Sequence, residues 1–215
     1  VVGCDLEAFG PRFFERYIWP KDAMFVESPE HREVIYLGKL PSGTASTSPK
    51  GKKALVFECS PDDLPEVIAV LRALVKAKPI SAQFVGGIAQ ADLQIIADKL
   101  KAAKYGVITW AAGALAFRQA ELTVQTLSEM IKDINDLGTR CSGLPLTGKE
   151  GDQTANQVCG WTTGYPARTR FSRGYPEYDP FLNDVQFMIE NNEADALVWV
   201  QAFNSRSVPP VTHLP

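Results

Sequence analysis

Short apolar runs alternate with amphipathic helical segments along most of the chain, and this alternation limits the possible folds more than any other feature. Near-continuous apolar runs bounded by Gly, Pro or Ser are typical of strands buried on both faces of a parallel sheet. Strands that alternate with helices predict right-handed β-α-β units, so we expect an α/β fold with a mainly parallel sheet. The runs are Val34–Leu37, Ala54–Phe57, Gly106–Trp110, Thr139–Leu144 and Ala196–Val200.

Four segments between or after these runs have helical periodicity. In the first, Ser60 is suited to the N-cap and Pro61 to the first helical position. Its apolar stripe comprises Leu64, Val67, Ile68, Leu71, Leu74 and Val75. The other three helices are expected at about Gln90–Ala103, Arg118–Leu137 and Phe181–Asn192, with Gly138 just past the end of the third. We expect two α/β subdomains, residues 1–80, incomplete at the N-terminus, and residues 81–215.

Residues 145–180 are predicted to form one long loop, rich in Gly and punctuated by Tyr-Pro pairs. Loops longer than about 12–15 residues usually carry a binding role or are disordered. This loop follows the strand expected at Thr139–Leu144, and ligands bind at the carboxyl ends of strands in open parallel sheets. Arg168, Arg170 and Arg173 could form an anion-binding edge or a charged subunit interface. Internal ion pairs with the nearby Glu177 and Asp179 are the alternative.

Charge and cysteine usage exclude several kinds of function. The net charge of −3 argues against broad binding to nucleic acids or membrane surfaces, and no apolar stretch is long enough to span a membrane. The cysteines are too scattered for a zinc or iron–sulfur site, so we expect reduced cytoplasmic thiols. His31 and His213 lie in segments that predict surface positions, not catalytic ones. The four cysteines are Cys4, Cys59, Cys141 and Cys159.

The Tyr-Pro loop carries a specific resemblance. Gly164-Tyr165-Pro166, followed by the stretch Arg170 to Pro180, resembles the B subunit of formylmethanofuran dehydrogenase, a relative of the molybdopterin-dependent formate dehydrogenases. The resemblance implies Rossmann-like sheets with flanking helices, as in the central domains of those formate dehydrogenases. Further similar motifs occur in the family's order: Gly3-Cys4, Pro11-Arg12, Arg16-Tyr17, Leu71-Arg72-Ala73-Leu74-Val75, Gly106-Val107-Ile108, Asp133-Ile134-Asn135 and Glu193-Ala194-Asp195-Ala196-Leu197.

The entrance of this loop departs from the family pattern. Where the dehydrogenases carry Met-Pro-Met-Arg-Gly-His, this chain reads Leu144-Pro145-Leu146-Thr147-Gly148-Lys149. Thr147 therefore stands at the position of the active-site Arg, and Lys149 at that of the neighbouring His. Thr cannot form the bidentate contact that an Arg makes with a carboxylate. We therefore expect no catalytic residue, metal or cofactor in this chain; the family's metal-binding part lies upstream of Val1.

This pattern resembles the B subunit of the bacterial formyltransferase/hydrolase complex of methylotrophs. The resemblance implies a non-catalytic structural subunit, with amidohydrolase-like A, β-helix C and formyltransferase D subunits as partners. The complex would convert formyl-tetrahydromethanopterin to formate through a formylated furan coenzyme, using metal ions on other subunits. Two alternatives remain open. One is a redox-active B subunit of a tungsten or molybdenum formylmethanofuran dehydrogenase. The other is a module that binds an anionic coenzyme tail through Arg168, Arg170 and Arg173.

Overall fold

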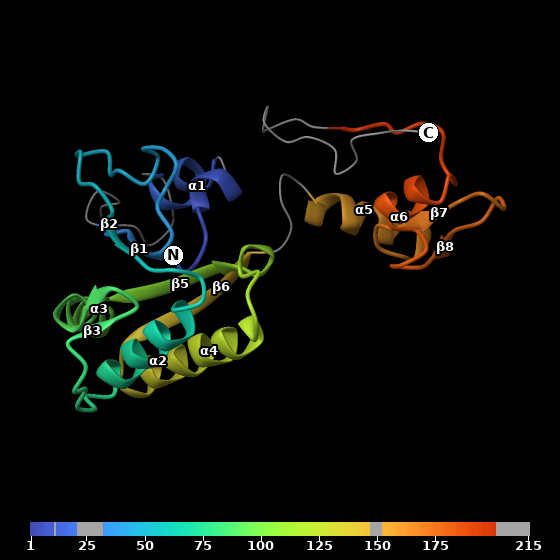
Figure 1. Cartoon of the computed structure of the whole chain (residues 1–215). Helices are drawn as coiled ribbons and strands as arrows, with labels where there is room; N and C mark the ends of the chain where they lie inside the picture. The colour runs from blue at the N-terminus through green and yellow to red at the C-terminus, as the bar shows by residue number, and fades with distance from the viewer. Residues whose placement is uncertain (11, 21–31, 147–151, 201–215) are drawn as a thin grey trace. The chain divides into compact units, whose positions relative to one another are not determined.

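The structure is a computed structural model that describes residues 1–200 except 11, 21–31 and 147–151. It divides into two compact units, Val1–Thr147 and Gly148–Pro215. We describe them separately as the N-terminal and the C-terminal unit. Both contain helices and strands, and the chain is of the mixed α/β class (Figure 1). Within the described residues, no helix combines the length and the apolar character that crossing a membrane requires.

The N-terminal unit is built on parallel strands. β1 (Ile35–Gly38) pairs in parallel with β2 (Leu55–Glu58), and β5 (Tyr105–Ala111) pairs in parallel with β6 (Arg140–Leu146). Each of these strands lies within one or two residues of an apolar run in the sequence. Four of the five predicted strands are therefore confirmed, together with their parallel direction.

Val2 joins the two pairs of strands. It forms parallel bridges with Leu37 of β1 and with Trp110 of β5. Its backbone N–H donates to the carbonyl of Thr109 over 2.8 Å, and the N–H of Gly3 donates to the carbonyl of Leu37 over 2.9 Å. The strand order is therefore β2, β1, the segment around Val2, β5 and β6.

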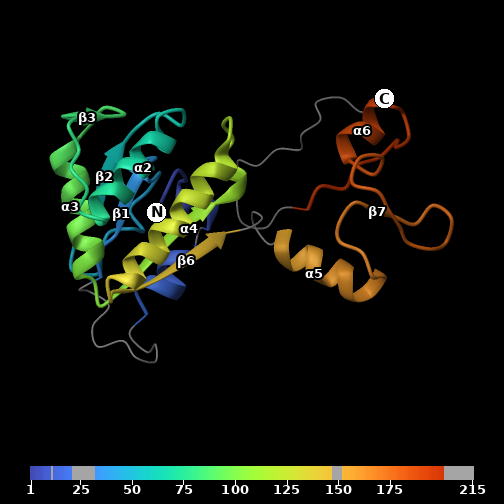
Figure 2. The same cartoon turned by 90° about the horizontal axis from the view of Figure 1, so that it is seen from below.

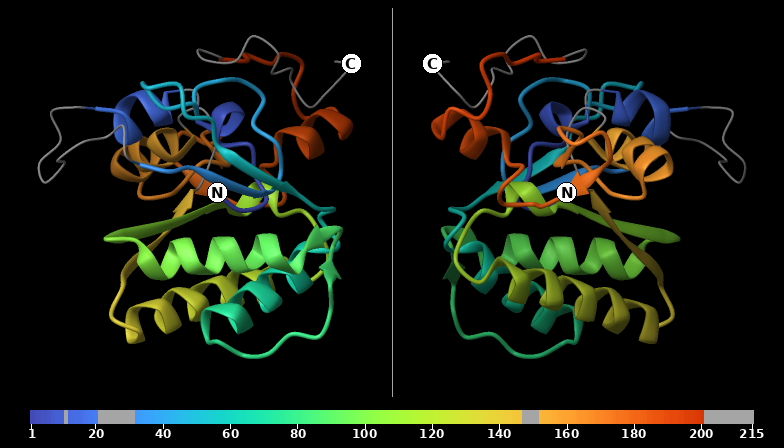
Figure 3. Two further views of the ribbon diagram at one scale, coloured as in Figure 1. Left: turned by 90° about the vertical axis from the view of Figure 1, so that its left-hand side faces the viewer. Right: turned by 90° about the vertical axis from the view of Figure 1, so that its right-hand side faces the viewer.

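Three helices lie on one side of these strands (Figure 3). They are α2 (Leu64–Val75), α3 (Gln90–Ala102) and α4 (Ala120–Asp136). α2 contacts both α3 and α4, and Figure 2 shows α2 and α4 side by side. All three were predicted, but α2 begins at Leu64 and not at Pro61. The preceding residues form a turn instead, in which the Ser60 hydroxyl accepts the N–H of Asp63 at 3.1 Å.

One hydrophobic core unites the helices and the strands of this unit. All six residues of the predicted α2 stripe are buried, and Leu93 of α3 and Leu127 of α4 have no exposed surface. The predicted boundary between residues 80 and 81 differs from the observed division, because α2 lies before it whereas α3 and α4 lie after it. Helices from both sides of that position share the same core. Gly138 has a φ of +91°, as expected just past the end of α4.

The other side of the strands carries a smaller apolar cluster. Side chains alternate along a strand, so Leu37 joins the main core while Tyr36 joins this second cluster with Leu6 and Phe14. Leu6 belongs to α1 (Leu6–Phe9), and Phe14 begins a π-helical turn, Phe14–Ile18. A two-stranded antiparallel hairpin, β3 (Phe84–Val85) with β4 (Ile88–Ala89), precedes α3.

The C-terminal unit contains short elements. They are α5 (Asp152–Thr163), β7 (Thr169–Arg170), β8 (Glu177–Tyr178) and α6 (Val185–Glu190), and β7 pairs antiparallel with β8. The prediction of one continuous loop over residues 145–180 is wrong for residues 152–163, which are helical.

Two further predictions in this unit also need correction. The helix expected at Phe181–Asn192 is shorter, because Asp184 caps α6 by accepting the N–H groups of Gln186 and Phe187. The strand expected at Ala196–Val200 does not form, since no described segment pairs with it. Val198 and Val200 are 86% and 88% exposed.

Candidate functional site

The carboxyl edge of the parallel strands is where an open α/β sheet would bind a ligand. Gly3 follows Val2, Gly38 ends β1, Cys59 follows β2, and Leu115 follows β5 through the short 3₁₀ turn Ala112–Ala114. A Cβ added to Gly38 would lie in van der Waals contact with Gly3, 3.6 Å from its Cα. The two glycines therefore bring the backbones of neighbouring strands close together at this edge.

Leucine side chains fill the space above Gly3. A Cβ atom on Gly3 would lie 2.5 Å from Cδ2 of Leu115 and 2.9 Å from Cδ2 of Leu64. Both leucines are buried. The surface that two glycines could offer to a phosphate or a ring is therefore in contact with the protein's own apolar side chains.

The start of α2 also lacks the features of a phosphate site. Helix N-termini bind anions through free N–H groups. Here the N–H of Asp63 donates to Ser60 Oγ at 3.1 Å, and that of Leu64 donates to the Ser60 carbonyl at 3.2 Å. Pro65, the second residue of α2, has no N–H, and Asp62 adds a negative charge. The described residues at this edge therefore do not fit a pterin dinucleotide, whose diphosphate needs donors and positive charge.

Burial makes three of the four thiols poor metal ligands. Desolvation raises the pKa of Cys4 and of Cys141, and desolvation together with the Asp63 carboxylate raises the pKa of the Cys59 thiol to about 11. Thiols with such pKa values stay protonated at neutral pH, and metals bind the thiolate. Among residues 1–200, apart from the gaps named above, no three His, Cys, Asp or Glu side chains are grouped to hold a metal ion.

The predicted anion-contact residues lie in the C-terminal unit and are paired within it. Arg168 Nη2 lies 2.9 Å from Asp184 Oδ2, while Arg170 Nε and Arg173 Nη1 each lie 3.5 Å from a Glu177 oxygen. The structure therefore contains the internal ion pairs given as the alternative. Arg170 and Arg173 share Glu177 as their partner, whereas Arg168 pairs with Asp184.

Asp179, the other carboxylate named from the sequence, has a different role. Its Oδ1 accepts the N–H groups of Phe181 and Leu182 at 2.9 Å each. These two hydrogen bonds lower the pKa of the Asp179 carboxyl group. Thr147 and Lys149, the degenerate family positions, lie outside the described residues, as do His31 and His213.

Several large aromatic side chains are exposed in the C-terminal unit. Trp161 and Phe181 are 78% and 79% exposed, and more than half of Phe171 and Tyr175 is exposed. Among the described residues of this unit only Asn183 and Ile189 are buried. Protein–protein interfaces are enriched in aromatic residues and Arg. We call Trp161, Phe171, Tyr175 and Phe181 the aromatic surface.

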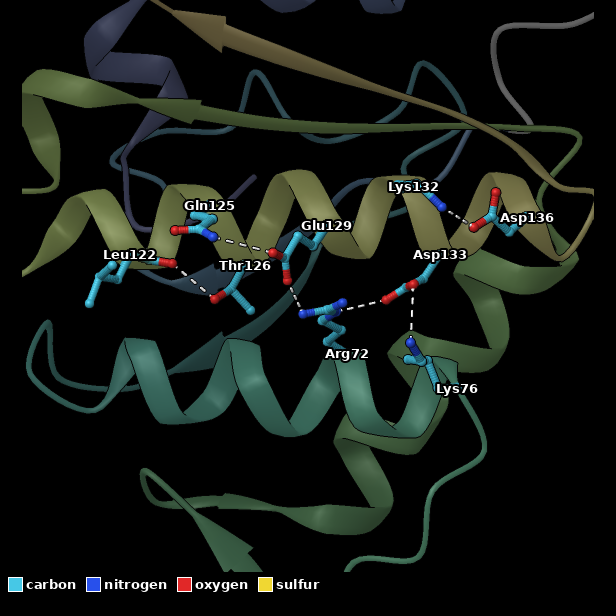
Figure 4. Close-up of polar contacts among 9 residues, drawn as sticks. All are labelled: Arg72, Lys76, Leu122, Gln125, Thr126, Glu129, Lys132, Asp133 and Asp136. Atoms are coloured by element: carbon cyan, nitrogen blue, oxygen red, sulfur yellow. Dashed lines mark hydrogen bonds and ion pairs between the residues drawn. The ribbon is translucent and has the colours of Figure 1, made fainter.

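Two of the family-like motifs meet between α2 and α4 (Figure 4). Arg72 Nε donates to Asp133 Oδ2 over 2.7 Å, and Arg72 Nη1 also pairs with Glu129. Lys76 Nζ lies 3.3 Å from the other Asp133 oxygen. These ion pairs hold α2 and α4 together. The two motifs therefore stabilise the contact between these helices.

Asn135, from the same motif, binds the edge of β6. Its Nδ2 donates to the carbonyl of Cys141 at 2.8 Å, and its Oδ1 accepts the N–H of Cys141 at 3.1 Å. The side-chain amide thus occupies backbone groups that a further strand would otherwise bind. Sequence reasoning assigned no role to Asn135, because this contact depends on where α4 ends relative to β6.

Comparisons with known proteins support the resemblance drawn from the motifs. No protein-family model matches the sequence. The chain is 25% identical over 189 residues to the B subunit of the tungsten-containing formylmethanofuran dehydrogenase 2 of Methanococcus maripaludis, covering 87% of this chain and 42% of that protein. It is 24% identical over the same length to the corresponding protein of Methanocaldococcus jannaschii.

A bacterial relative matches a shorter stretch at higher identity. The B subunit of the formyltransferase/hydrolase complex Fhc of Methylorubrum extorquens is 35% identical over 130 residues, which is 60% of this chain and 32% of that protein. One chain of the crystal structure of that complex, solved with methylofuran, superposes with a TM-score of 0.51 and 27% identity over 89% of this chain and 47% of that chain.

The resemblance to the B subunit of formylmethanofuran dehydrogenase and to its counterpart in the bacterial complex is therefore confirmed. The chain spans less than half the length of the curated relatives it matches.

Proposed function

We propose that this chain is part of the B subunit of a formyltransferase/hydrolase complex and serves there as a structural, non-catalytic component. Such a complex would convert formyl-tetrahydromethanopterin to formate through a formylated furan coenzyme, in the cytoplasm, as part of one-carbon metabolism. The relative with the higher identity is named as the B subunit of such a complex, and the structural match comes from a crystal structure of it.

The observation that carries the structural role is the filled carboxyl edge of the sheet. A redox subunit must hold a pterin cofactor, and parallel sheets of this class bind nucleotide-like ligands at that edge. Leu115 and Leu64 occupy the space over Gly3, and the carboxylates of Asp62 and Asp63 directly precede α2. Thr147, in place of the family's Arg, supports the same proposal from the sequence.

The same proposal includes a Rossmann-like fold for the N-terminal unit. Parallel strands in the order β2, β1, Val2, β5 and β6, with α2, α3 and α4 on one side, support a Rossmann-like arrangement. We propose that this arrangement derives from the central domains of molybdopterin-dependent formate dehydrogenases and has kept their framework without their redox centre.

The proposed partners are an amidohydrolase-like A subunit, a β-helix C subunit and a formyltransferase D subunit. The metal ions, the furan coenzyme and tetrahydromethanopterin would be bound by these subunits. The aromatic surface of the C-terminal unit supports a subunit role, since single aromatic side chains often dominate the energy of a protein interface. The ion pairs of Arg168, Arg170 and Arg173 leave less free charge for an anionic coenzyme tail.

The test is co-purification. The chain, in its full-length protein and carrying an affinity tag, is co-expressed with the A, C and D subunits. We expect all four to elute together in a fixed ratio with formyl-hydrolase activity, and Lys149→Ala in the tagged protein should leave that activity unchanged. Elution of the tagged protein alone, as a stable monomer, would contradict the proposal.

A further inference from the structure

We propose that the groove between the end of α2 and the length of α3 binds a small organic acid that has a carboxylate and a flat apolar body. The groove has a volume of about 430 Å³. This is within the range of small-molecule sites, which are largely apolar with a few placed polar groups. Its lining residues are Leu74, Ala77, Lys78, Pro79, Ile80, Gln90, Gln94 and Lys101.

The groove has an apolar part and a polar part. Leu74 from the main core, with Pro79 and Ile80 from the segment after α2, supplies the apolar part. Gln90 and Gln94 lie one helical turn apart on α3, so their carboxamides share one face of that helix. An apolar ring could therefore pack on one wall while a polar group meets carboxamide donors on the other.

The charge of the lining is positive. Lys78 and Lys101 are the charged residues of the lining, which contains no Asp or Glu. Lys101 is balanced by Asp98 at 2.9 Å, and Asp98 also accepts a hydrogen bond from Gln94. Within the described part of the chain, no carboxylate lies within ion-pair distance of Lys78. Its charge remains available to an anionic ligand.

The backbone after α2 holds Lys78 at the rim. The N–H of Lys78 donates to the carbonyl of Ala73 at 2.9 Å, and that of Ala77 donates to the carbonyl of Leu74 at 3.0 Å. This is a helix-ending motif that requires a left-handed residue, usually Gly, at the position of Ala77. Ala77 adopts a φ of +54° despite its Cβ, and Ala77 lines the groove. The backbone of the rim is thus held by hydrogen bonds within the chain.

These groups favour a carboxylate over a phosphate. A phosphate ester is usually held by several backbone N–H groups or by Arg, and no Arg lines the groove. The Lys78 ammonium group, the Gln90 carboxamide and the Gln94 N–H that is not donated to Asp98 could together satisfy a single carboxylate. The apolar wall would contribute the remaining affinity. This site is independent of the proposed subunit role.

The test uses 2-naphthoate and its uncharged isostere 2-naphthamide. Amide chemical shifts of the whole chain are followed by NMR during titration with each compound, for the wild type and for Lys78→Met. Lys78 is exposed, so its replacement should leave the fold intact. Lys53→Met, an exposed lysine outside the groove, is the matched control.

We expect saturable binding of 2-naphthoate with a Kd of about 1 mM and shifts centred on Leu74, Ile80 and Gln94. Naphthamide and Lys78→Met should each weaken binding about fivefold, whereas Lys53→Met should not change it. The proposal would be overturned by an absence of saturable binding, by shifts centred elsewhere, or by equal affinity in Lys78→Met.

Discussion

Arg72 Nε of α2 donates to Asp133 Oδ2 of α4 over 2.7 Å, and this contact joins two segments that resemble the same family at separate points of the sequence. Only 13% of the Asp133 side chain is exposed, and Lys76 provides a second cation. Both helices bury their apolar stripes in the main core. The ion pair therefore fixes the alignment of two helices that hydrophobic burial alone would hold with less specificity.

Removing the cation from this contact should destabilise the N-terminal unit. Arg72→Met leaves Asp133 with only Lys76 as a partner, so we expect a loss of about 1–2 kcal/mol in the free energy of unfolding, measured by urea denaturation. Lys132→Met removes an exposed ion pair with Asp136 on the same helix and should have no measurable effect. An equal effect of both variants would contradict the assigned role of Arg72.

The same contact should make stability depend on pH. The hydrogen bond from Arg72, then the one from Lys76, and then the charges of both residues lower the pKa of Asp133 below its ordinary value, against a smaller opposing effect of burial. A carboxyl group with a lowered folded-state pKa stabilises above its unfolded pKa of about 3.9 and loses that contribution as the pH falls through the folded value. The stability difference between wild type and Asp133→Asn should therefore be constant above about pH 5 and shrink at lower pH. A difference that grows on acidification would contradict this assignment.

Gly3 should not accept a side chain. Gly3→Ala places a Cβ against Leu115 and Leu64 at a residue whose φ is +62°. We expect a loss of about 2–4 kcal/mol from overpacking and backbone strain, measured by thermal unfolding. Gly113→Ala, with open space around its Cβ position and no positive φ, is the control. In the double variant Gly3→Ala/Leu115→Ala the loss should be smaller than the sum of the losses in the two single variants, and full additivity would refute the contact.

Cys59 should react slowly with iodoacetamide. Its pKa of about 11 keeps the thiolate fraction small at neutral pH. The alkylation rate, followed by mass spectrometry, should rise about tenfold per pH unit and level off near pH 11. In an unfolded chain, the rate should level off near pH 8.5. A plateau near pH 8.5 in the folded protein would show that the thiol is not desolvated.

Hydrophobic periodicity predicted the N-terminal unit well. α2, α3 and α4 each bury a stripe at helical spacing, and the four strands are short apolar runs between turn residues. These elements pack on one another, so burial and sequence pattern agree. Val1-Val2-Gly3 has the pattern of a strand that ends in a turn, but a two-residue apolar run does not indicate that Val2 lies between Leu37 of β1 and Trp110 of β5.

The C-terminal unit was predicted less well because its elements lack that pattern. Residues 152–163 contain Gly160 and three threonines, which are weak helix formers, yet they form α5. Ala196–Val200 has the composition of a buried strand, but composition does not supply a neighbouring strand. The three arginines were identified from the sequence, but their ion-pair partners were only partly predicted. Glu177 is the partner of Arg170 and Arg173 because β7 pairs with β8, and Asp184 is the partner of Arg168 because it caps α6.

The most direct measurement for the central claim is the tungsten, molybdenum and pterin content of the purified four-subunit complex. Metal is measured by inductively coupled plasma mass spectrometry, and pterin by fluorescence after oxidative release. If the B subunit is structural, the complex contains neither tungsten nor molybdenum in stoichiometric amount, releases no pterin and still hydrolyses its formylated coenzyme. One tungsten or molybdenum atom per B subunit, with formate oxidation by an artificial electron acceptor, would contradict the account.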